Sequence, residues 1–146
     1  MPSLIELEAE FHVYGEKTAT WTRVKPGADP LDPNAPTEQH TGPQAFMQRV
    51  DTLAEAQGVW FRCPLCYAKN KGPVGTHWVD VTFRGKGVPD KLGSHDSSGK
   101  PSRWQVVSGS GLADLVLAPS VHLAGAGGCG WHGFCGMAGV PPGHAR

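Results

Sequence analysis

Residues 58–66 read GVWFRCPLC, a short β-prone run that ends in two cysteines separated by two residues. Valine, tryptophan and phenylalanine favour a strand over residues 58–62, and that strand delivers Cys63 and Cys66 at a tight turn. Cysteine pairs with this spacing bind one metal ion through both thiolates. The stretch therefore predicts half of a zinc site.

A second pair of candidate ligands, with the same spacing, lies near the carboxyl end in residues 129–132, CGWH. Two such pairs supply the four ligands of a tetrahedral structural zinc. The preferred ligand set is Cys63, Cys66, Cys129 and His132, which joins distant parts of the chain through one ion. Four protein ligands close the coordination shell, so this zinc is expected to be structural rather than catalytic.

The choice of fourth ligand stays open because residues 132–135, HGFC, repeat the spacing. Cys135 is the alternative to His132, and zinc accepts either set. The competing interpretation is that the cysteines are buried small side chains or form disulfides. The amino terminus lacks a basic segment followed by an apolar run, so we expect no secretory signal, no membrane span and a reducing compartment.

The expected fold class is α+β: a single strand-rich domain with one main helix and a structural zinc site. The helix is predicted at 44–57, where Phe46, Val50 and Leu53 recur at helical spacing. Strict alternation predicts a strand at 5–13 with His12 on its outer face. Further strands are predicted at 18–24, 58–62, 78–83, 103–107 and 112–117, and loops at 26–43 and 85–102. The 146 residues divide into an amino-terminal part (1–57), a zinc-stapled β-rich part (58–139) and a tail (140–146).

Charge is unevenly distributed although the formal net charge is zero. Residues 1–59 hold nine acids and four bases, whereas residues 60–104 hold eight bases and three acids. Basic and aromatic side chains together bind single-stranded nucleic acid, so a nucleic-acid-binding module is an alternative function. The candidate patch comprises Lys69, Lys71, Arg84, Lys86, Lys91, Lys100 and Arg103, with Tyr67, Trp78 and Trp104.

Four strings occur in order along the carboxy-terminal half: CPLC at 63–66, GPVGTH at 72–77, FRG at 83–85 and GCGWHGF at 128–134. In these strings the chain resembles a family of small, uncharacterised phage-encoded proteins, over roughly residues 58–139. The resemblance implies a Cys/Cys/Cys/His metal set. The position of Cys135 usually looks aliphatic in that family, which agrees with treating it as a non-ligand.

The resemblance implies no known reaction. It makes a phage or prophage interaction protein the expected function, either a virion component or an accessory factor that binds a phage or host protein. The expected location is the host cytoplasm or the virion, and the oligomeric state is left open.

Enzymatic alternatives are weaker. A dithiol redox protein places its Cys-x-x-Cys motif at a helix start, which lowers the pKa of the thiol, and Asn70, Gly72, Pro73 and Gly75 are expected to interrupt any helix here. Neither a phosphate-binding loop nor a Gly-x-Ser-x-Gly string occurs. His77 with Asp80, His95 with Asp96, and His122 are candidates for a separate site, but such residues are common in loops and at strand ends.

Overall fold

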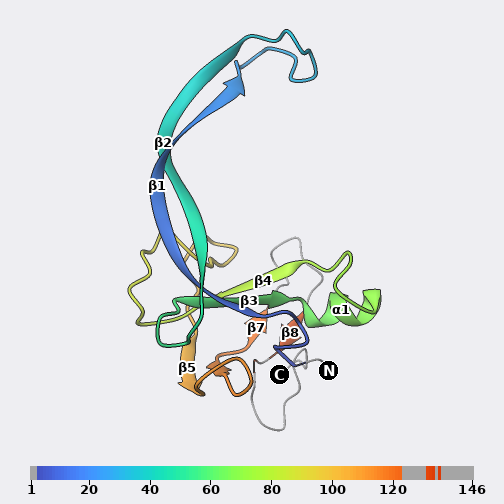
Figure 1. Cartoon of the computed structure of the whole chain (residues 1–146), viewed down its shortest axis with the longest axis vertical. Helices are drawn as coiled ribbons and strands as arrows, with labels where there is room; N and C mark the ends of the chain where they lie inside the picture. Colours follow the sequence, from blue (N-terminus) through green and yellow to red (C-terminus); the bar gives the residue numbers. More distant parts are fainter. Residues whose placement is uncertain (1–2, 123–130, 134, 136–146) are drawn as a thin grey trace. The chain divides into compact units, whose positions relative to one another are not determined.

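The computed structural model describes residues 3–122, 131–133 and 135, with only the backbone of residues 122 and 132 (Figure 1). The chain divides into two compact units. The body consists of Met1–Tyr14 and Met47–Arg146, and the ribbon consists of Gly15–Phe46. The two long strands β1 and β2 contribute to both units.

Eight strands and one helix are described. They are β1 (Glu10–Val24), β2 (Thr37–Val50), β3 (Gly58–Arg62), α1 (Pro64–Asn70), β4 (Trp78–Thr82), β5 (Gln105–Ser108), β6 (Val116–Ala118), β7 (Val121–His122) and β8 (His132–Gly133). One sheet has the strand order β2-β1-β3-β4, while β5 with β6 and β7 with β8 form two-stranded sheets. No helix in this part of the chain is long and apolar enough to cross a membrane.

The core of the body lies on one face of the β3–β4 pair. Val59 faces Val81 and Phe61 faces Val79 across this antiparallel pair, and all four side chains are buried. The buried Trp131 ring meets Phe61 edge to face, with 6.0 Å between ring centroids. The strands predicted at 58–62 and 78–83 are therefore confirmed, and their alternating apolar residues form the core.

The opposite face of the sheet carries a polar cluster. The Tyr14 hydroxyl donates to Asp80 Oδ1 at 2.6 Å and lies 2.8 Å from Thr82 Oγ1. His12 Nε2 lies 2.9 Å from Asp80 Oδ1, an ion-pair distance without hydrogen-bond geometry. Burial and the Asp80 carboxylate raise the pKa of Tyr14 above its ordinary value. His12 was expected on this outer face, yet it is only 1% exposed because the Tyr14 and Trp60 rings lie against it.

Gly58 leaves room for this cluster. A Cβ at Gly58 would lie 2.6 Å from Tyr14 Oη and 2.9 Å from the Val81 carbonyl oxygen. We therefore expect Gly58→Ala to lower the free energy of unfolding by about 1–3 kcal/mol, as overpacking does. Urea denaturation followed by tryptophan fluorescence measures this change. The control is Gly111→Ala, whose Cβ meets nothing within 4 Å. Equal stability of the two variants would contradict the close approach at Gly58.

The predicted α+β class with one main helix is wrong. Strand accounts for 43% of the described residues and helix for 6%. The segment predicted as a helix at 44–57 continues β2 to Val50 and then turns toward β3. Phe46 is 37% exposed, so the helical spacing of its apolar residues does not mark a buried stripe. Pairing with β1 decides the structure of this segment instead.

Other expected elements shift at their ends. The predicted loop at 26–43 stops where β2 begins at Thr37. In the predicted strand at 5–13, the first residues form a turn that buries Leu4 and Leu7, and β1 begins only at Glu10. The strands predicted at 103–107 and 112–117 correspond to β5 and β6, which start later, end one residue further on and pair antiparallel.

Candidate metal centre

Two segments that meet at one end of the β3–β4 pair bring three candidate metal ligands together. Cys63 directly follows β3, and His77 directly precedes β4. Arg62 is paired with Trp78 in the antiparallel register, and the next backbone contact is a hydrogen bond from the Cys63 N–H to the His77 carbonyl oxygen, at 2.9 Å. The strand register therefore places His77 beside Cys63.

Helix α1 supplies the third candidate ligand, Cys66. Pro64 occupies the start of the helix, where its missing N–H costs no hydrogen bond. The Tyr67 N–H donates to the Cys63 carbonyl oxygen at 2.8 Å, which closes the first turn. Lys71 ends the helix in the left-handed conformation. A single helical turn thus places Cys66 close to Cys63.

The loop that returns from α1 to His77 is held by hydrogen bonds around Thr76. The Thr76 hydroxyl donates to the Gly72 carbonyl oxygen at 2.7 Å and accepts from Asn70 Nδ2 at 3.1 Å. Arg62 donates from Nη1 to the Thr76 carbonyl oxygen at 2.9 Å. These contacts fix the backbone immediately before His77.

Cys63, Cys66 and His77 lie close enough to hold a metal ion. Their ligand atoms are all within 4.8 Å of one another. Ligand atoms of a tetrahedral zinc site with ordinary bond lengths are about 3.5–3.8 Å apart, so small side-chain adjustments close the set around an ion. Cys63 is buried, Cys66 is partly buried and His77 is exposed.

The four ligands predicted from the sequence fall into two groups. Cys63 and Cys66 lie together as their spacing indicates. Cys129 lies outside the described residues. The backbone of His132 pairs with His122 between β8 and β7, but its side chain is not described. The assignment of the second pair therefore remains a prediction.

Cys135, the alternative fourth ligand, is a buried free thiol. Burial raises its pKa to about 12, which favours the protonated thiol. Within the described part of the chain it belongs to no group of three or more candidate ligands. Its surroundings are those of a small apolar core residue.

His77 was not among the predicted ligands. The sequence suggested it only as a partner for Asp80, which instead contacts His12 and Tyr14. The useful signal was positional, because an antiparallel hairpin brings the residue after the first strand next to the residue before the second. The proposed pairing of His95 with Asp96 also fails, since His95 contacts backbone carbonyls and Asp96 accepts from Ser98 and Lys100.

Two members of the predicted basic and aromatic patch have structural contacts. The Arg103 guanidinium donates to carbonyl oxygens of the preceding loop, including those of Leu92 and Ser94. The Trp104 indole donates to the Ser120 carbonyl oxygen at 3.3 Å. Trp78 is 38% exposed, with the Arg62 guanidinium 3.9 Å from its ring centroid. The side chains of Arg103 and Trp104 thus stabilise neighbouring loops through hydrogen bonds to the backbone.

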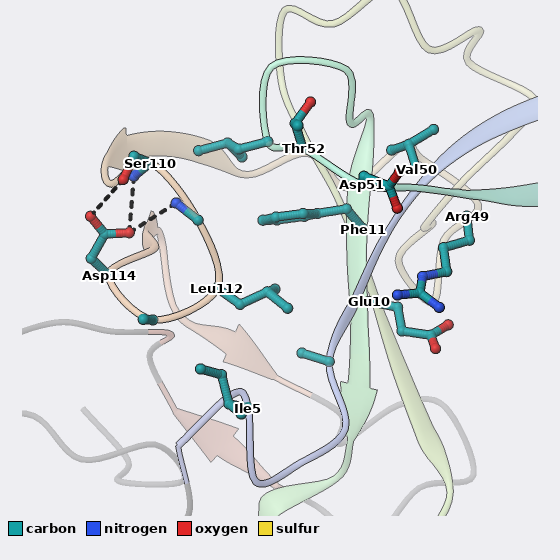
Figure 2. A pocket seen from close by; sticks show the side chains of 14 residues that line it. Ile5, Glu10, Phe11, Arg49, Val50, Asp51, Thr52, Ser110, Leu112 and Asp114 are labelled. Carbon is teal, nitrogen blue, oxygen red and sulfur yellow. Dashed lines mark hydrogen bonds between the residues drawn. The ribbon is translucent and has the colours of Figure 1, made fainter.

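A cavity of about 620 Å³ lies elsewhere in the body (Figure 2). Phe11, Leu112 and Ile5 line its apolar part. One wall is a short loop in which Asp114 accepts hydrogen bonds from Ser110 and the following glycine. None of the three clustered metal ligands lines this cavity.

Comparison of the chain with protein-family models, with curated proteins and with solved structures gave no match. The metal site proposed below therefore rests on the side chains of this protein alone.

Proposed function

We propose that this protein is a zinc-stabilised interaction module in which the ion joins β3, α1 and β4 to the carboxy-terminal segment. The observation that carries the proposal is the convergence of Cys63, Cys66 and His77. Two thiols and an imidazole suit zinc, whereas magnesium and calcium prefer oxygen ligands. The resemblance of the strings at 63–66 and 128–134 to phage-encoded proteins supports a phage or host protein as the partner, with the host cytoplasm or the virion as the place of action.

The His77 ring contacts the backbone, as the rings of metal-binding histidines commonly do. Its Nδ1 lies 3.3 Å from the Trp78 carbonyl oxygen. With the proton on Nδ1 directed at that oxygen, Nε2 carries the lone pair that binds zinc. The backbone of β4 then orients the ligand.

A tetrahedral zinc has one position left after Cys63, Cys66 and His77. We propose that a residue of the predicted second pair, Cys129 or His132, takes that position. Only one of these two residues fits a four-ligand shell that already contains His77. In this proposal, one member of the second pair predicted from the sequence is therefore not a ligand. Closure of the shell by protein ligands leaves no site for a reactive water, which favours a structural ion over a hydrolytic one.

Dithiol redox chemistry is the alternative for the same cysteines. Helix α1 begins at Pro64 and ends at Asn70, where Asn70, Gly72 and Pro73 were expected to interrupt it. Cys63 therefore sits at a helix start, as redox motifs require. The nearby His77 nevertheless favours metal binding, because it supplies a third ligand within reach of both sulfurs.

Native mass spectrometry of protein purified without chelator or added metal tests the proposal. We expect one zinc per chain, and a large loss of bound zinc in His77→Ala because one ligand is missing. His95→Ala is the control, since His95 is an exposed histidine whose two ring nitrogens contact backbone carbonyl oxygens of its own loop. Metal-free wild-type protein, or zinc retained equally by both variants, would refute the proposed site.

A further inference from the structure

The ribbon, Gly15–Phe46, exposes both of its faces. None of its residues is buried. Its two strands are held by the Lys25 N–H, which donates to the Pro36 carbonyl oxygen at 3.0 Å, and by the hydroxyls of Thr20 and Thr41, 2.9 Å apart. These contacts place Thr20 opposite Thr41 and define the cross-strand register of the ribbon.

The two faces differ in chemistry, because side chains alternate along each strand. One face is polar: Gln39 Nε2 donates to Thr22 Oγ1 at 2.8 Å, beside the Thr20–Thr41 contact. The other face is aromatic and charged. It carries Lys17, Trp21, Arg23, Glu38, His40 and Phe46.

Contacts within the ribbon order this second face, here called the aromatic face. The rings of Trp21 and His40 stack with 6.1 Å between centroids. Phe46 lies over Gly15, where a Cβ would come within 2.4 Å of its ring. Toward the turn, Arg23 Nε lies 3.4 Å from Glu38 Oε1. The aromatic face thus has a ring-rich stretch followed by an ion pair.

The exposed rings of the aromatic face favour contact with another molecule, which would cover them. Trp21 is 41% exposed and Phe46 is 37% exposed, and an isolated two-stranded ribbon is only marginally stable in water. The ribbon carries three lysines and arginines against four acids, two of them, Asp29 and Asp32, in its turn. The aromatic face itself carries Lys17 and Arg23 against Glu38, and a face with both signs of charge is better matched by a protein surface that also carries both than by a uniformly anionic phosphate backbone.

We propose that the cover is the aromatic face of a second copy of this chain, related by a two-fold axis that runs along the ribbon. Such an axis lays each strand over the opposite strand of the other copy. Arg23 of one copy then faces Glu38 of the other, and Lys17 faces the neutral Gln44. In this arrangement, the charges on the aromatic face of one copy are therefore complementary to those on the aromatic face of the other.

The alternative dimer of two aromatic faces places β1 of one copy over β1 of the other. The charged residues of β1 on this face are Lys17 and Arg23, both cationic, so that arrangement opposes like charges. The lengthwise two-fold axis avoids this repulsion and also brings the Trp21 ring toward His40 of the other copy. Electrostatic complementarity thus selects one orientation of the dimer.

Sedimentation equilibrium on the full chain tests the proposal. We expect the wild-type protein to have twice the mass of one chain, and Arg23→Glu and Glu38→Arg to be monomeric when each is examined alone. In a dimer of either single variant, the side chains at positions 23 and 38 of both copies would all carry charges of the same sign. Mixing the two variants opposes glutamates with arginines again, so we expect a one-to-one heterodimer although the ion pair within each ribbon remains broken.

Thr18→Glu, which adds one negative charge to the polar face, should leave the dimer intact. Circular dichroism of each variant verifies that the body stays folded. A monomeric wild-type chain at high concentration, or a mixture of the two charge variants that stays monomeric, would overturn the proposal. Dimers that persist in both single variants would do the same. The inference uses ribbon residues only and does not depend on the zinc.

Discussion

Replacing Cys63 by serine is expected to release the metal and to destabilise the body. Cys63 is fully buried and belongs to the core cluster, so its loss as a ligand acts at the junction of β3 and α1. A metal that binds only the folded state stabilises it by about 4 kcal/mol when free metal exceeds the dissociation constant a thousandfold. That is a large share of the stability of a domain of this size. Thermal unfolding with and without a chelator measures the loss.

Cys135→Ser is the matched control for this substitution. Both cysteines are buried, and both changes replace a thiol by a hydroxyl of similar shape. Cys135→Ser should keep one zinc per chain and lose only the cost of burying a hydroxyl, about 1–3 kcal/mol. Chelator should lower the melting temperature of wild-type protein and Cys135→Ser but not that of Cys63→Ser. An identical response of all three proteins would refute a stabilising metal at Cys63.

Phe61→Ala is expected to cost about 3–5 kcal/mol of unfolding free energy, the range for an aromatic residue deleted from a core. Phe61 is 1% exposed, faces Val79 across the sheet and meets the Trp131 ring edge to face. Its removal leaves a cavity and also loosens Trp131, which directly precedes the predicted ligand His132. We therefore expect weaker zinc retention as well as lower stability.

Denaturant titration and zinc competition measure the two effects of Phe61→Ala. Val107→Ala is the comparison, since Val107 lies on β5 and is 54% exposed. That variant should change the unfolding free energy by no more than about 0.5 kcal/mol. If Phe61→Ala were equally mild, the β3–β4 face would not be the core of the body.

The sequence predicted the short strands of the body well and the long segments poorly. Residues 58–62 alternate β-prone residues that bury one face, and that pattern depends on nearest neighbours only. The segment that forms β2 contains Pro43 and apolar residues at helical spacing, so its local pattern favoured a loop and then a helix. Its strand conformation comes from pairing with β1, for example between Thr20 and Thr41, which are 21 residues apart in the sequence.

The site shows the same division between local and non-local information. The two-residue spacing of Cys63 and Cys66 indicated their proximity without knowledge of the fold. His77 is separated from them by α1 and a loop, and only the register of β3 against β4 places it beside Cys63. Predicting that contact required the two strands to be recognised as one antiparallel hairpin.

X-ray absorption at the zinc edge, on wild-type protein purified without added metal, tests the central claim most directly. The proposed site predicts sulfur at about 2.3 Å together with histidine nitrogen at about 2.0–2.1 Å. Three sulfurs would identify Cys129 as the fourth ligand, and two sulfurs with two nitrogens would identify His132. A shell of oxygen or nitrogen without sulfur, or the absence of bound zinc, would contradict a metal centre built on Cys63, Cys66 and His77.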